Sequence, residues 1–394
     1  MDFTNLTESL EKLAKSENPQ TLIKDDAARV RLMEAARAIS LKLEMPFETY
    51  FRLVFSDMSV GLALAGVELG VWQAIVAKSP GGVSASDLAK ELGILEITLA
   101  RILRFAATNY VIDEVSEDVY RANNITLHFT APRAESVVFL ATSQAVRVGN
   151  VLPEFFTKNK LEDPATARPL PWNLATQSPL PVYDWLAEHP RERDAFNDFM
   201  FVQTTGMASF IETFPLEKYL DVSDATERVQ FVDVGGGSGH VSRAVLAKYP
   251  TLHGKIAVED REQAGTVTRA DFAKEGLQRI PYDFFTPQPL KGAKVFYLRN
   301  ILHNWSDANC KLILEQLREG LASDSIILID DIVIPPTGAH WYSTHMDLMM
   351  LTNLGATERT EAQFDVLFDS VGLKVNKIVR YNSYGPAILA VVPK

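Results

Sequence analysis

A run of glycines directly after an apolar segment is the feature that most restricts how this chain folds. Residues 229–234 are predicted to form a buried strand, which is followed by Gly235-Gly-Gly-Ser-Gly239 and a helix from about Val241. Open α/β sheets bind ligands at the carboxyl ends of their strands, where glycine lets the backbone approach a ligand closely. We therefore expect a ligand-binding domain of this type, at residues 221–394.

The apolar segments around this loop alternate with helical patterns. Further strands are predicted at residues 256–259, 295–298 and 325–329, near Val375 and at 387–392. Strands that alternate with helices form a doubly wound, mostly parallel sheet. The predicted fold class is therefore α/β, with a Rossmann-like catalytic domain.

The residues after three successive strands fit a nucleoside without a phosphate. Asp233 can accept hydrogen bonds from an ammonium group, and Asp260 can accept them from a ribose diol. Asp283 and Phe284 offer an acceptor and an aromatic face to a purine. An NAD-linked dehydrogenase is disfavoured, because His240 stands where the pattern G-x-G-x-x-G requires its third glycine.

Residues 1–160 are predicted to form an all-helical and winged-helix dimerisation domain. Two helices over residues 86–110 precede a short hairpin at residues 111–122, which is the order of a winged helix-turn-helix. The apolar helices at residues 32–43 and 51–64 exceed what so small a core can cover, so we expect a homodimer. Residues 161–220 are expected to link the domains and to supply helices to the substrate pocket.

The composition limits the partners of the 394-residue chain. Its net charge of -11 disfavours nucleic acid and anionic membranes, and with them a DNA-binding regulator. The single cysteine, Cys310, excludes an internal disulfide, and the histidines lack metal-ligand spacing. No segment approaches the roughly 18 apolar residues of a membrane span. We therefore expect a cytoplasmic enzyme without a metal that acts on a small molecule.

The segment that begins in the predicted strand at residues 295–298 carries the recognisable chemistry. Tyr297-Leu-Arg-Asn-Ile-Leu-His-Asn-Trp-Ser-Asp307 resembles the "HDW.D" motif of plant and fungal small-molecule O-methyltransferases of the caffeate type. Further similar motifs are Ile326-Ile-Leu-Ile-Asp-Asp-Ile-Val-Ile-Pro335, Met346-Asp-Leu-Met-Met350 and Glu358-Arg-Thr-Glu-Ala-Gln-Phe364. The resemblance covers the chain from about residue 50 and implies a class I methyltransferase fold, a dimer and S-adenosylmethionine as the cofactor.

The resemblance also implies roles for individual residues. His303 matches the general base of the family, and Asp331 and Glu358 match the acidic pair that flanks it. Asp260 and Asp283 match the ribose and adenine contacts. The remaining candidate contacts of the cofactor are Asp233, Gly235, Gly237, Gly239, Phe284 and Arg299. A base suits this chemistry, because a phenol of pKa about 10 is a poor nucleophile at neutral pH and imidazole titrates near 6.5.

A mostly apolar set of residues is predicted to line the substrate pocket, and it suits an aromatic or polyketide-like ligand, although core packing explains these residues equally well. The set comprises Phe199, Met200, Met207, Trp305, Met346, Met350 and Asn353.

Two departures from the family pattern leave a second interpretation open. Asn304 replaces the usual Asp after the base, and Asp331 replaces a usual Glu. The same fungal family includes pericyclases of the leporin type, which retain S-adenosylmethionine and use a His and a cation on the substrate. His128 and Arg299 occupy similar places here, whereas Asn300 replaces the acidic neighbour of that cation. The alternatives are therefore methyl transfer to a hydroxyl and a pericyclic step on a pyridone-type substrate.

Overall fold

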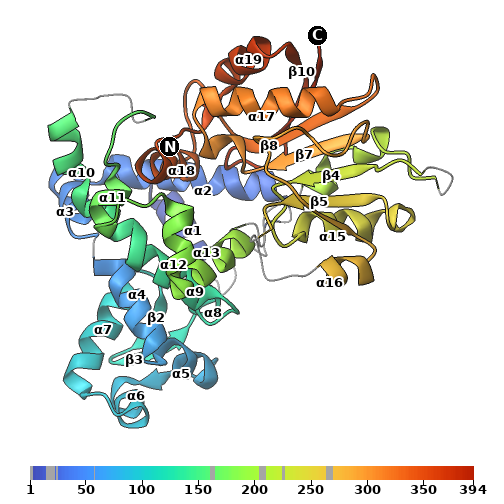
Figure 1. Ribbon diagram of the computed structural model, residues 1–394. Helices are drawn as coiled ribbons and strands as arrows, with labels where there is room; N and C mark the ends of the chain where they lie inside the picture. Colours follow the sequence, from blue (N-terminus) through green and yellow to red (C-terminus); the bar gives the residue numbers. More distant parts are fainter. Residues whose placement is uncertain are drawn as a thin grey trace. The chain divides into compact units, whose positions relative to one another are not determined.

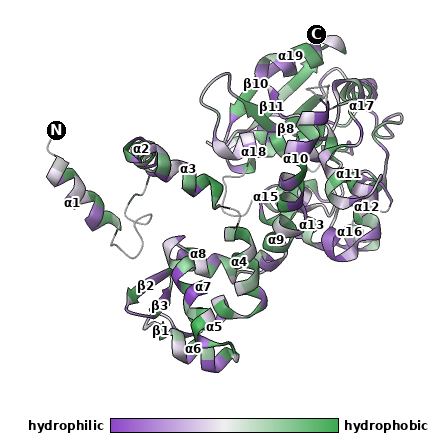
Figure 2. Cartoon of the chain, turned by 90° about the vertical axis from the view of Figure 1, so that its left-hand side faces the viewer, coloured by the Kyte–Doolittle hydropathy of each residue, from purple (hydrophilic) through white to green (hydrophobic). Residues whose placement is uncertain are grey.

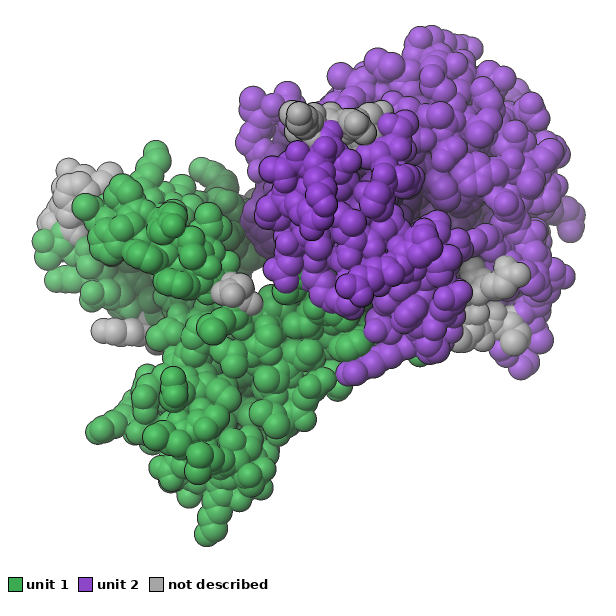
Figure 3. All heavy atoms as spheres, turned by 60° about the vertical axis from the view of Figure 1, so that its left-hand side comes forward, with its two compact units in different colours: residues 1–146, 194–202 green, residues 147–193, 203–394 purple. Residues whose placement is uncertain are grey.

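The computed structural model describes residues 3–14, 23, 25–56, 58–159, 165–203, 210–223, 227–262 and 269–394. The chain divides into two compact units, which Figure 3 colours separately. The first comprises Met1–Val146 and Asp194–Val202, and the second comprises Arg147–Arg193 and Gln203–Lys394. The three-part division made from the sequence stays a prediction.

The first unit is mainly helical. Its elements are α1 (Phe3–Ala14), α2 (Asp26–Leu43), α3 (Pro46–Val54), α4 (Met58–Glu68), α5 (Val71–Lys78), β1 (Val83–Ser84), α6 (Ala85–Leu92), α7 (Glu96–Thr108), β2 (Ile112–Ser116), β3 (Val119–Ala122), α8 (Asn124–Phe129), α9 (Ala134–Leu140) and the π-helical turn η2 (Ala141–Ala145).

The core of the first unit lies between α5, α6, α7 and a small sheet of strand order β1-β3-β2. Ser84 caps α6 by accepting a hydrogen bond from the Asp87 amide. On α7, Leu99 and Leu103 are fully buried one turn apart, as the helical spacing of the sequence predicts. Two helices and a hairpin thus follow one another in the expected order, and the assignment as a winged helix stays a prediction.

The second unit combines a sheet with helices on both faces. Its elements are α10 (Val146–Asn159), α11 (Pro171–Thr176), α12 (Val182–Glu188), α13 (Pro190–Val202, which enters the first unit at Asp194), α14 (Phe210–Thr213), η3 (Leu216–Lys218), β4 (Phe231–Val234), α15 (His240–Lys248), η4 (Pro250–Leu252), β5 (Ile256–Asp260), α16 (Arg269–Lys274), β6 (Gln278–Pro281), β7 (Val295–Arg299), η5 (Leu302–Asn304), α17 (Asp307–Gly320), β8 (Ile326–Ile334), α18 (Trp341–Leu354), β9 (Arg359–Thr360), α19 (Glu361–Ser370), β10 (Leu373–Arg380) and β11 (Pro386–Pro393).

The large sheet confirms the doubly wound α/β class. Its strand order in the described chain is β10-β11-β8-β7-β4-β5-β6, with β9 paired to β8. β4 pairs in parallel with both β5 and β7, whereas β11 runs antiparallel to β8 and β10. The strand order reverses between β4 and β7, and ligands bind at such a switch point. β6 is the strand expected before Asp283, for which the sequence analysis gave no bounds.

Apolar side chains fill both faces of this sheet. Figure 1 shows α15 and α16 on one face and α17 and α19 on the other. Val245 of α15 and Phe272 of α16 belong to the apolar cluster on the first face. Leu314 of α17 and Phe368 of α19 belong to the cluster on the second face. Because both faces are covered, β4 and β7 are buried along nearly their whole length. The carboxyl ends of these strands therefore hold their side chains on a rigid base.

Helix α3 of the first unit is largely hydrophobic (Figure 2), and its exposed side chains form an apolar surface. Phe47, Tyr50 and Leu53 are each at least 59% exposed. Pro46 stands at the first turn of α3, where its missing amide hydrogen costs nothing. Among the described residues no single helix is long and apolar enough to cross a membrane, and α3 and α4 reach that size only together, across a bend of 47°.

Candidate active site

The glycine loop after β4 bends in a way that glycine adopts easily. Gly235, Gly237 and Gly239 have φ angles of 75°, 54° and 76°. A Cβ atom at Gly235 or Gly239 would lie 2.5 Å from the side chain of Ile301 or Phe272. At Gly237 the nearest atom to such a Cβ is an Asp260 oxygen at 4.0 Å. The first and last glycines therefore serve packing, whereas the middle one leaves open space for a ligand.

Carboxylates at the strand ends surround this loop. Asp233 is buried below it, where burial raises its pKa to about 6 and its Oδ2 accepts a hydrogen bond from Ser242 at 2.8 Å. Asp260 Oδ2 accepts a hydrogen bond from the Gly237 amide at 2.8 Å. Asp283 accepts one from the Phe285 amide, and Phe284 packs edge-on against Trp305. Open space at Gly237 beside acceptors and aromatic rings fits an adenosine-bearing cofactor.

A cavity of about 160 Å³ opens at the switch point of the sheet. It brings together Arg299, His303, Asp331 and Met346, which the sequence analysis had selected. The other lining residues of the second unit are Gln203, Phe210, Ile211, His240, Val241, Ala244, Asn300, Asp330, Ile332, Tyr342, Tyr381, Asn382 and Pro386.

His303 is held by a carboxylate on a neighbouring segment. It lies on the short turn η5 after β7, and its Nδ1 donates to Glu358 Oε1 at 2.7 Å. Glu358 is fixed in turn, because its amide donates to Asp347 Oδ1 at 2.9 Å. With Nδ1 engaged, Nε2 is the ring nitrogen left for a ligand. Burial opposes a charge on His303, but the charge and hydrogen bond of Glu358 outweigh it and raise its pKa to about 9.

Asp331 lies close enough to His303 for its charge to help raise the pKa of the base, but no hydrogen bond joins the two side chains. It lines the cavity and is only 1% exposed, yet neither carboxylate oxygen has a hydrogen-bond partner among the described residues. Burial raises its pKa to about 7. The side-chain amide of Asn304 donates to the Asn300 carbonyl at 2.8 Å instead of to His303. Glu358 is thus the acid that orients His303.

Arg299 belongs to a second polar cluster of the cavity. Its Nε lies 3.9 Å from Asp330 Oδ2, and its Nη1 lies 3.4 Å from His240 Nε2. Asp330 also accepts hydrogen bonds from the hydroxyls of Tyr297 and Tyr381. Burial and the positive charges of Arg299 and Arg243 lower the pKa of His240 to about 4, so this imidazole is neutral at pH 7. A fixed guanidinium therefore faces the cavity beside an uncharged histidine.

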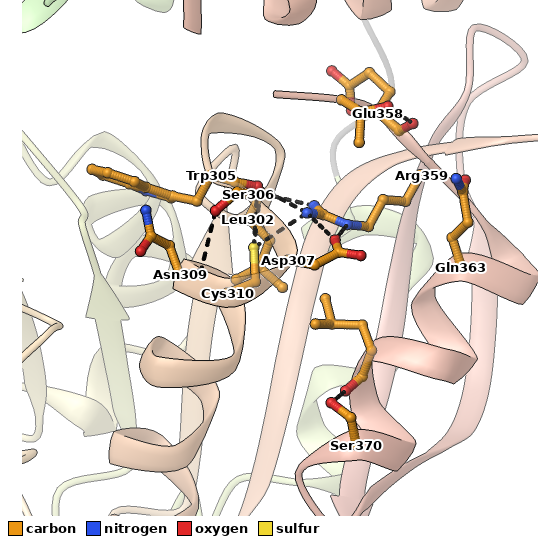
Figure 4. A network of polar contacts seen from close by, with 12 residues as sticks. Leu302, Trp305, Ser306, Asp307, Asn309, Cys310, Glu358, Arg359, Gln363 and Ser370 are labelled. Atoms are coloured by element: carbon orange, nitrogen blue, oxygen red, sulfur yellow. Dashed lines mark hydrogen bonds and ion pairs between the residues drawn. The ribbon is translucent and has the colours of Figure 1, made fainter. Parts of the chain in front are cut away.

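A buried arginine fastens the loop that carries His303 (Figure 4). Arg359 is 1% exposed, and its guanidinium donates to the carbonyls of Leu302 and Trp305 at 2.9 and 2.8 Å. The same group binds Asp307 Oδ1 at 2.8 Å and contacts the sulfur of Cys310. These partners lie on both sides of His303 in the sequence. Arg359 therefore holds the backbone of the loop while its neighbour Glu358 holds the ring.

The structure places the other predicted site residues outside this cavity or in the first unit. Trp305 packs with Phe284 and Phe285, Met350 is buried beside Met346, and Asn353 bonds to Thr352. His128, Phe199 and Met200 belong to the first unit, and their roles stay predictions. Met207 lies outside the described residues. In the part of the chain that the structure describes, no group of three His, Cys, Asp or Glu side chains could hold a metal ion.

Sequence reasoning missed several residues of the cavity. Tyr381 and Asn382 follow β10, far along the chain from the motifs, so no local pattern marked them. His240 was noted only as a departure from a dinucleotide pattern. Arg359 lies within a quoted motif, and an arginine beside an acidic residue of that motif was the available signal.

Comparison with known proteins decides the family. The family model of the O-methyltransferase domain matches residues 172–374. Demethylsterigmatocystin 6-O-methyltransferase of Aspergillus parasiticus is 30% identical, over 94% of either chain. The chain belongs to the O-methyltransferase family. Its cofactor is accordingly S-adenosylmethionine, and its relatives include methyltransferases of fungal secondary metabolism.

Solved structures of similar proteins have the same fold. The structure of LepI with S-adenosylmethionine is 28% identical, covers 100% of both chains and superposes with a TM-score of 0.88. A structure described as a pericyclic reaction enzyme is also 28% identical, covers 99% of this chain and 100% of its own, and has a TM-score of 0.87. This methyltransferase family member thus resembles proteins of both chemistries.

We expect Gly237→Val to abolish binding of S-adenosylmethionine. The branched side chain would occupy the open space of the loop and would adopt an unfavourable backbone conformation at φ 54°. Gly254→Val is the matched control, because Gly254 has φ 75° and an added Cβ meets nothing within 4 Å. Calorimetry should show loss of binding in the first variant only. Equal affinity in both variants would contradict the cofactor site.

We expect Arg359→Met to lower the free energy of unfolding by about 3 kcal/mol, because two buried carbonyls lose their donor. Arg121→Met serves as the control, since Arg121 forms a partly exposed ion pair with Asp113 and should change stability by less than about 1 kcal/mol. Urea titration followed by circular dichroism measures both values. A change of similar size in the two variants would contradict a special role for Arg359.

Proposed function

We propose that this enzyme transfers the methyl group of S-adenosylmethionine to a hydroxyl of an aromatic or polyketide-like metabolite. The observation that carries the proposal is the buried His303–Glu358 pair on the wall of a cavity next to the glycine loop. A general base in this position meets the requirement of hydroxyl methylation. Apolar side chains on the cavity wall, among them Phe210, Ile332 and Met346, suit an aromatic ring.

In methyl transfer, the cofactor, His303 and Glu358 have different roles. S-adenosylmethionine supplies an electrophilic methyl group. His303 Nε2 takes the proton of the substrate hydroxyl, and Glu358 stabilises the imidazolium that results. A base of pKa about 9 nearly matches a phenol of pKa about 10, so this proton moves at little cost. The same raised pKa means that only about 1% of the free enzyme has a neutral His303 imidazole at pH 7.

A pericyclic reaction is the second candidate function. Two observations favour it: the similarity to the pericyclic reaction enzyme and the guanidinium of Arg299 on the cavity wall. A buried imidazolium at His303 would also be a donor rather than a base at neutral pH. In this alternative His128 and Arg299 donate hydrogen bonds to a polarised substrate, and the cofactor keeps its methyl group.

We expect His303→Ala to lower kcat by about 100-fold or more if the enzyme transfers methyl groups, with cofactor affinity nearly unchanged. His128→Ala should then have a mild effect. For a pericyclase the order reverses, because His128 would supply a donor that strengthens in the transition state. Mass spectrometry of product and cofactor distinguishes a gained methyl group from an isomerised or dehydrated product. Small, equal losses in both variants would contradict both assignments.

The pH profile tests the same base. Since the neutral imidazole is the active form, kcat/KM should rise about tenfold per pH unit and level off near pH 9. Glu358→Gln removes the charge that raises this pKa, so the rising limb should move to lower pH.

We propose that the enzyme is a homodimer that pairs through the apolar surface of α3. A mass near twice 43.8 kDa is expected by light scattering. Leu53→Asp places a charge on this surface and should shift the mass toward the monomer, because an unpaired charge would have to be buried. Val366→Asp is the control, since Val366 is equally exposed, at 70%, but lies on α19. A wild-type mass that stays monomeric over a wide concentration range contradicts the proposal.

We also propose a cytoplasmic location. The free, buried thiol of Cys310 is compatible with a reducing compartment.

A further inference from the structure

Two adjacent carboxylates in the middle of β8, Asp330 and Asp331, differ in their hydrogen-bond partners. Asp330 receives hydrogen bonds from the hydroxyls of Tyr297 and Tyr381 and lies beside Arg299. Asp331 is equally buried and lines the same cavity, but neither of its oxygens has a partner among the described residues. Side chains of the protein thus provide partners for Asp330, whereas Asp331 is left as an acceptor for a ligand that enters the cavity.

An unpartnered buried acceptor is unfavourable and is rare outside functional sites. The nearest charges act on Asp331 in opposite directions, because His303 favours the ionised carboxylate and Glu358 disfavours it. No hydrogen bond joins Asp331 to His303, although the family usually has the longer glutamate here. The shorter side chain therefore ends at the cavity instead of pairing with the base.

We propose that Asp331 accepts a hydrogen bond from a second hydroxyl of the substrate, adjacent to the hydroxyl that meets His303. This inference rests on the proposed function for the role of His303. The substrate class is accordingly an aromatic compound with two neighbouring hydroxyls, in vicinal or peri positions.

The size and charge of the cavity support this class. The cavity of about 160 Å³ is small for a ligand site, so it suits a small ring system, and His303 and Asp331 both lie on its wall. A carboxylate requires a donor, and the guanidinium of Arg299 and the raised pKa of His303 disfavour a cationic amine. A neutral O–H group meets both conditions. Its hydrogen bond also compensates the ionised form of Asp331 for burial, which otherwise raises its pKa to about 7.

The test compares naphthalene-1,8-diol with 1-naphthol as probes of the full-length protein loaded with S-adenosylhomocysteine. Calorimetry of the wild type should show that the diol binds about 10- to 100-fold more tightly, the range expected for a hydrogen bond to a charged group. In Asp331→Leu this ratio should fall to about one. Asp365→Leu is the matched control, because it makes the same change at an exposed carboxylate of α19 that does not line the cavity, and it should keep the ratio.

Each outcome decides the proposal. Equal binding of the two probes by the wild type, binding of neither, or a ratio that survives in Asp331→Leu would overturn it. Methyl transfer from S-adenosylmethionine is measured separately by mass spectrometry. A diol preference that depends on Asp331 without any methylated product would support the inference and reject the proposed function. Methylation of both probes at equal affinity would support the function and reject the inference.

Discussion

The site depends on two neighbouring residues of opposite charge that hold the same loop. Glu358 binds the ring of His303, and Arg359 binds the carbonyls of Leu302 and Trp305 on both sides of it. A loop after a strand is ordinarily mobile, and a catalytic ring must be fixed to within a fraction of an ångström. Burying the guanidinium with several acceptors gives the loop the rigidity of the core. Lysine could not replace this arginine, because it lacks the planar set of donors.

The parallel sheet supplies the rest of the arrangement. β4 ends at the glycine loop, β7 ends at Arg299 and β8 continues through Asp330 and Asp331. Because these strands pair in parallel register, their carboxyl ends meet at one edge of the sheet. Groups that are about 100 residues apart in the sequence thus reach one cavity. The helices on both faces keep this edge in place, since β4, β7 and β8 are packed on two sides.

Much of this organisation could be predicted from the sequence, because it depends on local patterns. The glycine run, the strand that precedes it and the motif around His303 are contiguous, and each indicated its place in the fold. The bounds of β6, the strand expected before Asp283, could not be predicted because Gln278–Pro281 is short and only partly buried. The isolation of Asp331 could be suspected from its length but not established, because it depends on where β8 places that side chain relative to the ring. Tyr381 reaches the cavity only through an antiparallel strand pair near the end of the chain, which no motif indicates.

The position of Cys310 gives this protein a built-in reporter. It is the single cysteine of the chain, it is fully buried, and its thiol donates to the carbonyls of Leu302 and Trp305. Burial raises its pKa to about 12, so the reactive thiolate is scarce while the loop is closed. A thiol-directed reagent can modify this sulfur only when the segment around His303 opens. The rate of alkylation therefore measures, without any engineered label, how often the catalytic loop leaves its closed conformation.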